Sequence, residues 1–219
     1  MRNQWKGNDP LIRRFWLCLV VVGLQACTIQ GLRHEGLESV GDTKSGTIAV
    51  ADSATGLTGG RIGWGRLSLF YIPVAPIHIR GDESVQMMNV VGDALMAAGY
   101  EVSKESKEES QTPVLRCHVN KARFNNYTWL APIVPTWGGV DVRLSLDSPD
   151  GHTLWSRQLE GGGVTFNFFD GYDVVARKAI TKLANQMAEA FSGDDFYQAL
   201  NSVQSLPEAT EAPVHVEEE

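Results

Sequence analysis

The fold follows from one alternating stretch, Val140-Asp141-Val142-Arg143-Leu144-Ser145-Leu146-Asp147. Successive side chains of a strand point to opposite faces of a sheet, so this period of two predicts a strand with one buried face. The residues that follow, Pro149-Asp150-Gly151-His152, favour a tight turn, because Pro presets one backbone dihedral angle and Gly accepts positive φ. We therefore predict a β-hairpin over residues 138–159.

Shorter patterns upstream predict further strands. Leu115, Cys117 and Val119 alternate with polar residues, which predicts a strand that buries Cys117 and turns His118 to solvent. Short runs at residues 47–51 and 100–102 are also strand candidates.

Two segments resist this interpretation. Residues 67–79 are apolar, but Pro73 and Pro76 exclude a continuous central strand, because proline lacks the backbone donor of a sheet ladder. The run Gly161-Gly162-Gly163 is interpreted as a strand break or loose turn.

Apolar residues at helical spacing predict two main helices. The first covers residues 83–98, with an Asp82 cap and Gly99 as its end. Its apolar stripe is predicted to hold Val85, Met88, Leu95 and Met96. The second begins at Asp170 or Asp173 and ends at Phe191, before Gly193. Residues 194–200 add a short helical piece.

These elements predict an α+β fold, a two-layer sandwich whose mainly antiparallel sheet carries two main helices on one face. We assign residues 47–202 to this single domain. Residues 27–46, rich in Gly, Ser, Thr and charge, are predicted to be a flexible tether, and residues 203–219 a disordered acidic tail.

The amino terminus resembles the signal of a bacterial lipoprotein. Basic residues precede a ten-residue apolar run, too short to span a membrane, and Leu24-Gln25-Ala26-Cys27 follows. This tetrapeptide looks like the lipobox of that family, although Gln25 departs from the small residue usual there. The resemblance implies that residues 1–26 are a signal peptide and that Cys27 becomes the acylated first residue.

Further implications of this resemblance concern location. The acyl chains on Cys27, palmitate among them, would hold the protein on a membrane of the cell envelope. Thr28 is not the Asp that retains many lipoproteins in the inner membrane, so the outer membrane facing the periplasm is expected, with the inner membrane as the alternative. The domain itself, with its PDGHTLWS hairpin, resembles the Tol-propeller amino-terminal, curli-secretion and penicillin-binding-protein-activator lipoprotein domains.

Composition limits the function classes. The chain has 19 Lys+Arg and 26 Asp+Glu, and residues 1–26 hold four of the former and one of the latter, so the mature chain has a charge near −10. Such a surface argues against nucleic acid and against adsorption to anionic headgroups. No catalytic motif, cofactor motif or metal-ligand spacing is found among the histidines and cysteines, so we expect a protein that is not an enzyme.

Two apolar segments, residues 62–79 and 127–137, mix aromatic residues with prolines. They can pack on each other as an internal flap, or they can expose an apolar patch for a partner. In the second case the contact residues are Trp64, Phe70, Tyr71, Trp129 and Trp137. We predict an accessory or assembly factor of the envelope that docks a protein partner or its own copies. The alternatives are a carrier of a hydrophobic or lipid ligand and a hydrolase of envelope polymer.

Overall fold

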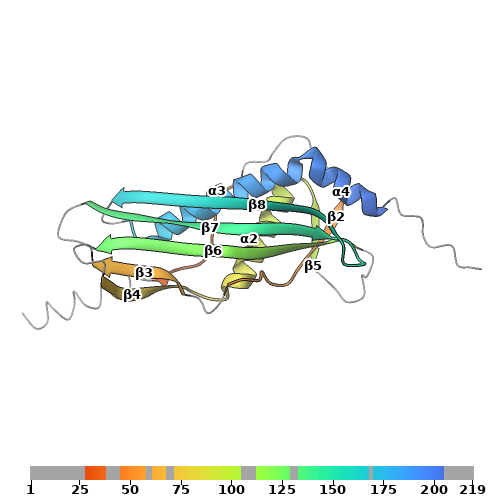
Figure 1. Cartoon of the computed structure of the whole chain (residues 1–219). Coiled ribbons are helices and arrows are strands. Elements are labelled where there is room, and N and C mark those ends of the chain that lie inside the picture. The colour runs from red at the N-terminus through yellow and green to blue at the C-terminus, as the bar shows by residue number, and fades with distance from the viewer. Residues whose placement is uncertain are drawn as a thin grey trace, which may run out of the picture.

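The structure is a computed structural model, and it describes residues 28–37, 45–57, 61–67, 72–104, 112–128, 133–167 and 170–204. Within these residues an eight-stranded sheet carries helices on one face (Figure 1). The strands are β1 (Thr28–Ile29), β2 (Thr47–Val50), β3 (Arg61–Leu67), β4 (Ile72–Ile79), β5 (Glu101–Lys104), β6 (Val114–Thr128), β7 (Ile133–Asp147) and β8 (Thr153–Asn167). The helices are α2 (Glu83–Ala97), α3 (Tyr172–Ser192) and α4 (Asp194–Gln204).

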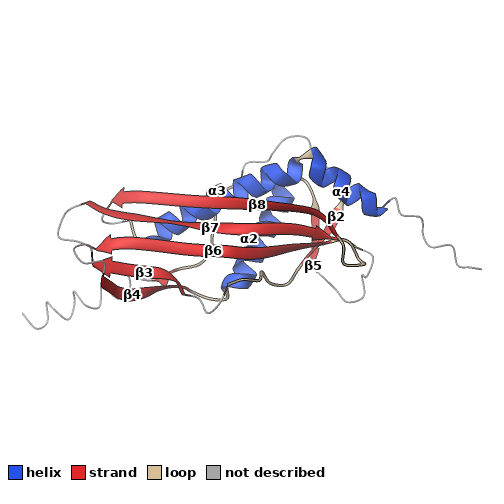
Figure 2. Cartoon of the chain, viewed as in Figure 1, coloured by secondary structure: helices blue, strands red, loops and turns tan. Residues whose placement is uncertain are grey.

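The long strands β6, β7 and β8 form an antiparallel meander (Figure 2), in which β8 pairs with β7 alone among the described strands. The second edge of β6 is shared, because β2 pairs with its beginning and β3 with its end, both in parallel. The predicted α+β class is confirmed, and so is the 138–159 hairpin, which extends to residues 133–167. The sheet is mixed rather than purely antiparallel.

The start of α2 agrees with its predicted cap. Asp82 Oδ1 accepts hydrogen bonds from the backbone nitrogens of Ser84 (3.0 Å) and Val85 (3.2 Å), and from Ser84 Oγ (2.6 Å). These bonds lower the pKa of Asp82, and the bond from the Ser84 side chain has the largest effect. Gly99 follows the helix with a φ of 94°, the left-handed conformation that glycine adopts at little cost.

The predicted stripe of α2 is partly wrong. Met88 and Leu95 are buried, but Val85 and Met96 are 41% and 56% exposed. The face that packs on the sheet is instead centred on residues 87, 90, 91 and 94, so Val85 and Met96 lie outside its arc.

The predicted caps of α3 are also wrong. Gly171 occupies the N-cap position and makes no side-chain bond. Asp170 instead accepts from Thr165 Oγ1 (2.6 Å) in β8, and Asp173 Oδ1 accepts from the backbone nitrogen of Gln30 (2.6 Å). Both carboxylates therefore join α3 to other parts of the chain. The predicted short helix is confirmed as α4, which runs four residues past the predicted end.

Pro73 and Pro76 lie within β4, a continuous strand that was not predicted. Both residues pair with β3 on one side, whereas β1 joins β4 on the other side only at His78 and Ile79. The prolines therefore occupy a stretch of β4 that is paired on one edge only, and edge positions are where a sheet tolerates proline.

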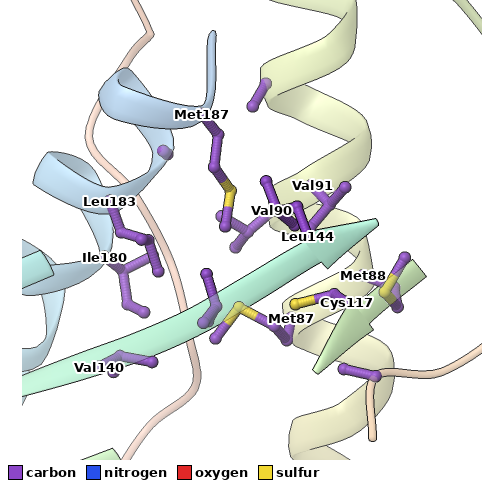
Figure 3. Packing of buried hydrophobic residues seen from close by; sticks show 14 of the residues in the cluster. Met87, Met88, Val90, Val91, Cys117, Val140, Leu144, Ile180, Leu183 and Met187 are labelled. Carbon is purple, nitrogen blue, oxygen red and sulfur yellow. The ribbon is translucent and has the colours of Figure 1, made fainter. Parts of the chain in front are cut away.

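The core lies between the helices and the buried face of the sheet (Figure 3). Met87 and Val91 of α2 and Ile180, Leu183 and Met187 of α3 pack over Val140 and Leu144 of β7. The predicted burial of Cys117 is confirmed, and its thiol lies beside this cluster.

Gly161 and Gly163 lie inside β8, so the predicted break or turn there is wrong. A Cβ on Gly161 would overlap the Ala179 carbonyl oxygen and come within 2.7 Å of Leu183 Cβ, and one on Gly163 would overlap the Val175 carbonyl oxygen. The two glycines face α3, and their missing side chains let its backbone rest directly on the strand.

Residues 28–37 form a docked segment that we call the strap, so the predicted flexible tether is wrong for this part. Ile29 and Leu32 are buried, and the Leu32 backbone nitrogen donates to Gln86 Oε1 of α2 (2.7 Å). The Glu35 backbone nitrogen donates to Thr181 Oγ1 of α3 (2.9 Å). The polar composition of the strap gave no sign that it docks. Its backbone nitrogens bind side chains of α2 and α3, which are distant in the sequence.

The glycine contact between β8 and α3 can be tested by adding one methyl group. We expect Gly161→Ala to destabilise the domain by about 1–3 kcal/mol, because overpacking forces α3 away from the strand. Gly162→Ala is the matched control, since its Cβ would meet nothing nearer than 3.8 Å. Denaturant unfolding measures both, and equal stability of the two variants would contradict the close approach.

Candidate contact surface

The face of β6, β7 and β8 opposite the helices, here called the open face, is polar at its centre. His118 and Arg143 are cross-strand partners there, and both are exposed. Asp141 accepts hydrogen bonds from Asn120 Nδ2 (3.1 Å) and Gln158 Nε2 (2.9 Å). Such side chains suit contact with water, so this part of the sheet does not need a second layer.

The open face becomes apolar at the end where β8 finishes. Trp137 of β7 is half-buried and lies opposite Val164 of β8, which is 50% exposed. Phe166, two residues further along the same face of β8, is 63% exposed. We call Trp137, Val164 and Phe166 the aromatic end. Large apolar side chains that are grouped on an exposed surface often mark a contact site.

Strand alternation creates the aromatic end. Thr136 and Thr165 are cross-strand partners that point to the helix side and are buried. Their neighbours in sequence must point to the open face. Val164 and Phe166 were not among the predicted contact residues, because the glycines before them were interpreted as a break. The alternation Val164-Thr165-Phe166 was the available signal.

Three connections leave the sheet at this same end. Leu67 pairs with both Ile72 and Thr128, and Ile133 pairs with Asn167. The β3–β4, β6–β7 and β8–α3 connections therefore all start and finish here (Figure 1). Figure 1 shows this end at the left, opposite the β7–β8 turn.

The predicted contact residues divide into three groups. Trp137 is in the aromatic end. Trp64 is in β3, where its backbone is in register with Asn125 of β6. Phe70, Tyr71 and Trp129 lie outside the described residues, in the β3–β4 and β6–β7 connections. Whether these five residues act together stays a prediction.

Hollows in the described surface lie on the helix side, along the strap. One of about 470 Å³ is lined mainly by polar residues, among them Arg33, His34, Asn89 and Asp93. His34 Nε2 lies 2.9 Å from Asp93 Oδ2, and His34 Nδ1 is buried without a hydrogen-bond partner. A second hollow of about 330 Å³ shares several of these residues. Linings of this kind do not suit an acyl chain.

Within the described residues no group of three or more His, Cys, Asp and Glu side chains is arranged to hold a metal ion. In the same part of the chain, no helix combines the length and the hydropathy required to cross a membrane.

No family model matches the sequence, and no curated protein matches it. Similar solved structures include a Xanthomonas campestris protein of family model DUF330, with a TM-score of 0.48, 11% identity, and coverage of 81% of this chain and 96% of that chain. A minor lipoprotein from Acinetobacter baumannii has a TM-score of 0.38, 14% identity, and coverage of 61% and 92%. The PelC dodecamer from Paraburkholderia phytofirmans has a TM-score of 0.36, 16% identity, and coverage of 70% and 95%. With TM-scores of 0.48 or lower, none of these similarities assigns a ligand, partner or activity to this chain.

The Cys117 thiol should be inert in the folded protein. Burial raises its pKa from 9.0 to about 12, so the nucleophilic thiolate is not formed near neutral pH. Above about pH 9 the unfolded thiol ionises while the folded one does not, so this group lowers the free energy of unfolding as pH rises from 9 to 12. In the chain from residue 28 onward, where Cys117 is the single cysteine, Ellman's reagent should react at pH 8 only after denaturation. Rapid reaction of the native protein would contradict the burial, and Cys117→Ala is the control.

Proposed function

We propose that this protein is a lipid-anchored accessory or assembly factor of the bacterial envelope that docks a partner through the aromatic end and the neighbouring connections. The observation that carries the proposal is the exposure of Val164 and Phe166 beside Trp137, on a sheet whose other face is closed by helices. The partner is a protein or another copy of this chain. Phe70, Tyr71, Trp64 and Trp129 are proposed to take part.

The anchor is proposed from the sequence alone. Cys27 follows a basic and apolar leader, and acylation there would supply the membrane affinity that an acidic mature chain lacks. The proposed location is the outer membrane on its periplasmic side. Because no catalytic group has been assigned, the protein is proposed to act by binding.

The second candidate function is that of a carrier for a hydrophobic or lipid ligand. It needs an enclosed apolar cavity, whereas the hollows along the strap are open and mainly polar. The exposed aromatic end therefore favours docking over carriage. A hydrolase of envelope polymer is the third candidate, and nothing in the described side chains favours it.

Cys27→Ser tests the anchor. The variant should remain as a soluble or uncleaved precursor without palmitate label, because the acyl chains supply the attachment. Labelling with palmitate and fractionation of cells measure this, and separation of the two membranes on a density gradient tests the outer-membrane assignment. A serine variant that is processed normally and stays in the membrane without label would overturn the lipoprotein proposal.

A photocrosslinker at position 166 tests the docking surface. We expect it to capture a defined envelope protein or a second copy in intact cells, whereas a crosslinker at position 143, on the polar centre of the open face, should not. Phe166→Ser should leave the melting temperature unchanged, because the ring is mostly exposed. It should weaken binding of the captured protein about tenfold, as loss of about 1.4 kcal/mol implies. Equal capture from both positions would contradict the assignment.

A further inference from the structure

The strap has a fixed direction along α3. The Gln30 backbone nitrogen donates to Asp173 in the first turn of α3, whereas the Glu35 backbone nitrogen donates to Thr181, two turns later. Arg177, between these positions, pairs with Glu35 (Nη1 to Oε1, 3.4 Å). The strap therefore runs in the same direction as α3, and its first residues lie beside the start of that helix.

The start of α3 is at the aromatic end. Asp170, just before the helix, accepts from Thr165 Oγ1 (2.6 Å) and from Asn167 Nδ2 (3.2 Å) in the last residues of β8. Thr165 lies between Val164 and Phe166 in the strand. Gln30 of the strap therefore lies beside the end of α3 that is nearest to the aromatic end.

The pairing of β1 gives the same direction independently. β1 pairs in parallel with β4, and β4 begins at Ile72, at the aromatic end of the sheet. A strand parallel to β4 also runs away from that end. Thr28 is therefore the end of β1 nearer to the aromatic end, and its partner His78 lies six residues, about 20 Å, along β4 from Ile72.

Little slack separates the proposed acyl group from this docked backbone. Three residue steps join Cys27 to Gln30, and at 3.3–3.6 Å per residue they reach at most about 11 Å. The predicted flexible tether of some 18 residues would instead span about 25 Å on average. The docked strap thus keeps the start of α3, where Gln30 is bound, within about 11 Å of Cys27 plus the width of this contact.

We propose that the aromatic end lies against the bilayer surface and contacts its lipids, with the strap as a rigid link between the anchor and the domain. This inference rests on the proposed function, because it requires acylation at Cys27. Aromatic and aliphatic side chains suit the boundary between headgroups and acyl chains. The charged centre of the open face and the turn at residues 148–152 stay in water, since a 15-residue strand places that turn about 50 Å away. A protein docked at the aromatic end is then one that lies in the plane of the same membrane.

Fluorescence quenching from the lipid phase tests this orientation. Phe166→Cys and His152→Cys are each labelled with the same fluorophore in the full mature protein, and buried Cys117 stays unlabelled. Both positions are exposed and lie at opposite ends of β8 or its turn. In vesicles of phosphatidylethanolamine and phosphatidylglycerol with nitroxide-labelled acyl chains, we expect quenching at position 166 to be at least about threefold that at position 152.

A second variant tests the strap. A Gly/Ser insert of about 20 residues is placed between Cys27 and Thr28. An added Thr directly after Cys27 keeps the second residue unchanged. The insert gives the link the length of a flexible tether. It should reduce quenching at position 166 to the level of position 152 while the protein stays in the membrane fraction. Persistent quenching would overturn the role of the strap, because the aromatic end would then bind lipid unaided.

The outcomes separate this inference from the proposed function. Membrane-bound protein with equal, weak quenching at both positions would overturn the orientation and leave the anchor intact. Capture of a protein from position 166 without lipid quenching would also overturn it, because that surface would then face away from the bilayer. If the wild-type protein, without substitution or insert, is absent from the membrane fraction, the proposed lipid anchor is overturned.

Discussion

The close packing of α3 on β8 is the constraint on which the other features depend. Gly161 and Gly163 let the helix backbone rest on the strand, and this contact holds α3 obliquely across the long strands (Figure 1). The fixed helix then supplies Asp173, Arg177 and Thr181 to the strap. Because α2 and α3 both cover the same face, the opposite face of β6–β8 is left to be polar at its centre and apolar at one end. A bulkier residue at either glycine would therefore disturb both the core and the attachment of the amino terminus.

Much of the fold could be predicted, because its signals are local. The alternation in residues 140–147 and the turn at Pro149-Asp150-Gly151 specify a hairpin without reference to the rest of the chain, and Asp82 caps α2 with bonds to residues two and three positions away. The incorrect predictions concern features whose structure depends on residues distant in the sequence. Gly161 is compatible with a strand only because α3 packs there, and the strap is ordered by a bond between residues 143 positions apart. No local pattern carries that information.

The contact surface could be predicted only in part, for a related reason. Trp137 was found through the apolar residues around it, and its place on the open face follows from the register of β7. Val164 and Phe166 were missed, because the exposed face of a strand is known only once the helix side is known. The proline-rich segments illustrate the same point, since Pro73 and Pro76 are compatible with β4 only where one of its edges is unpaired.

The acidic charge and the apolar end make different demands on membrane attachment. Without the proposed signal peptide the chain would have a charge near −10 and would be repelled by anionic headgroups, and three partly exposed apolar side chains contribute at most a few kcal/mol when they leave water. Such a surface would bind a bilayer weakly by itself. A covalent lipid linked through a short strap changes this balance, because the contact becomes intramolecular and its effective concentration depends on the length of the link. A strap of fixed direction also selects which surface meets the bilayer, whereas a long flexible tether would let the domain turn freely.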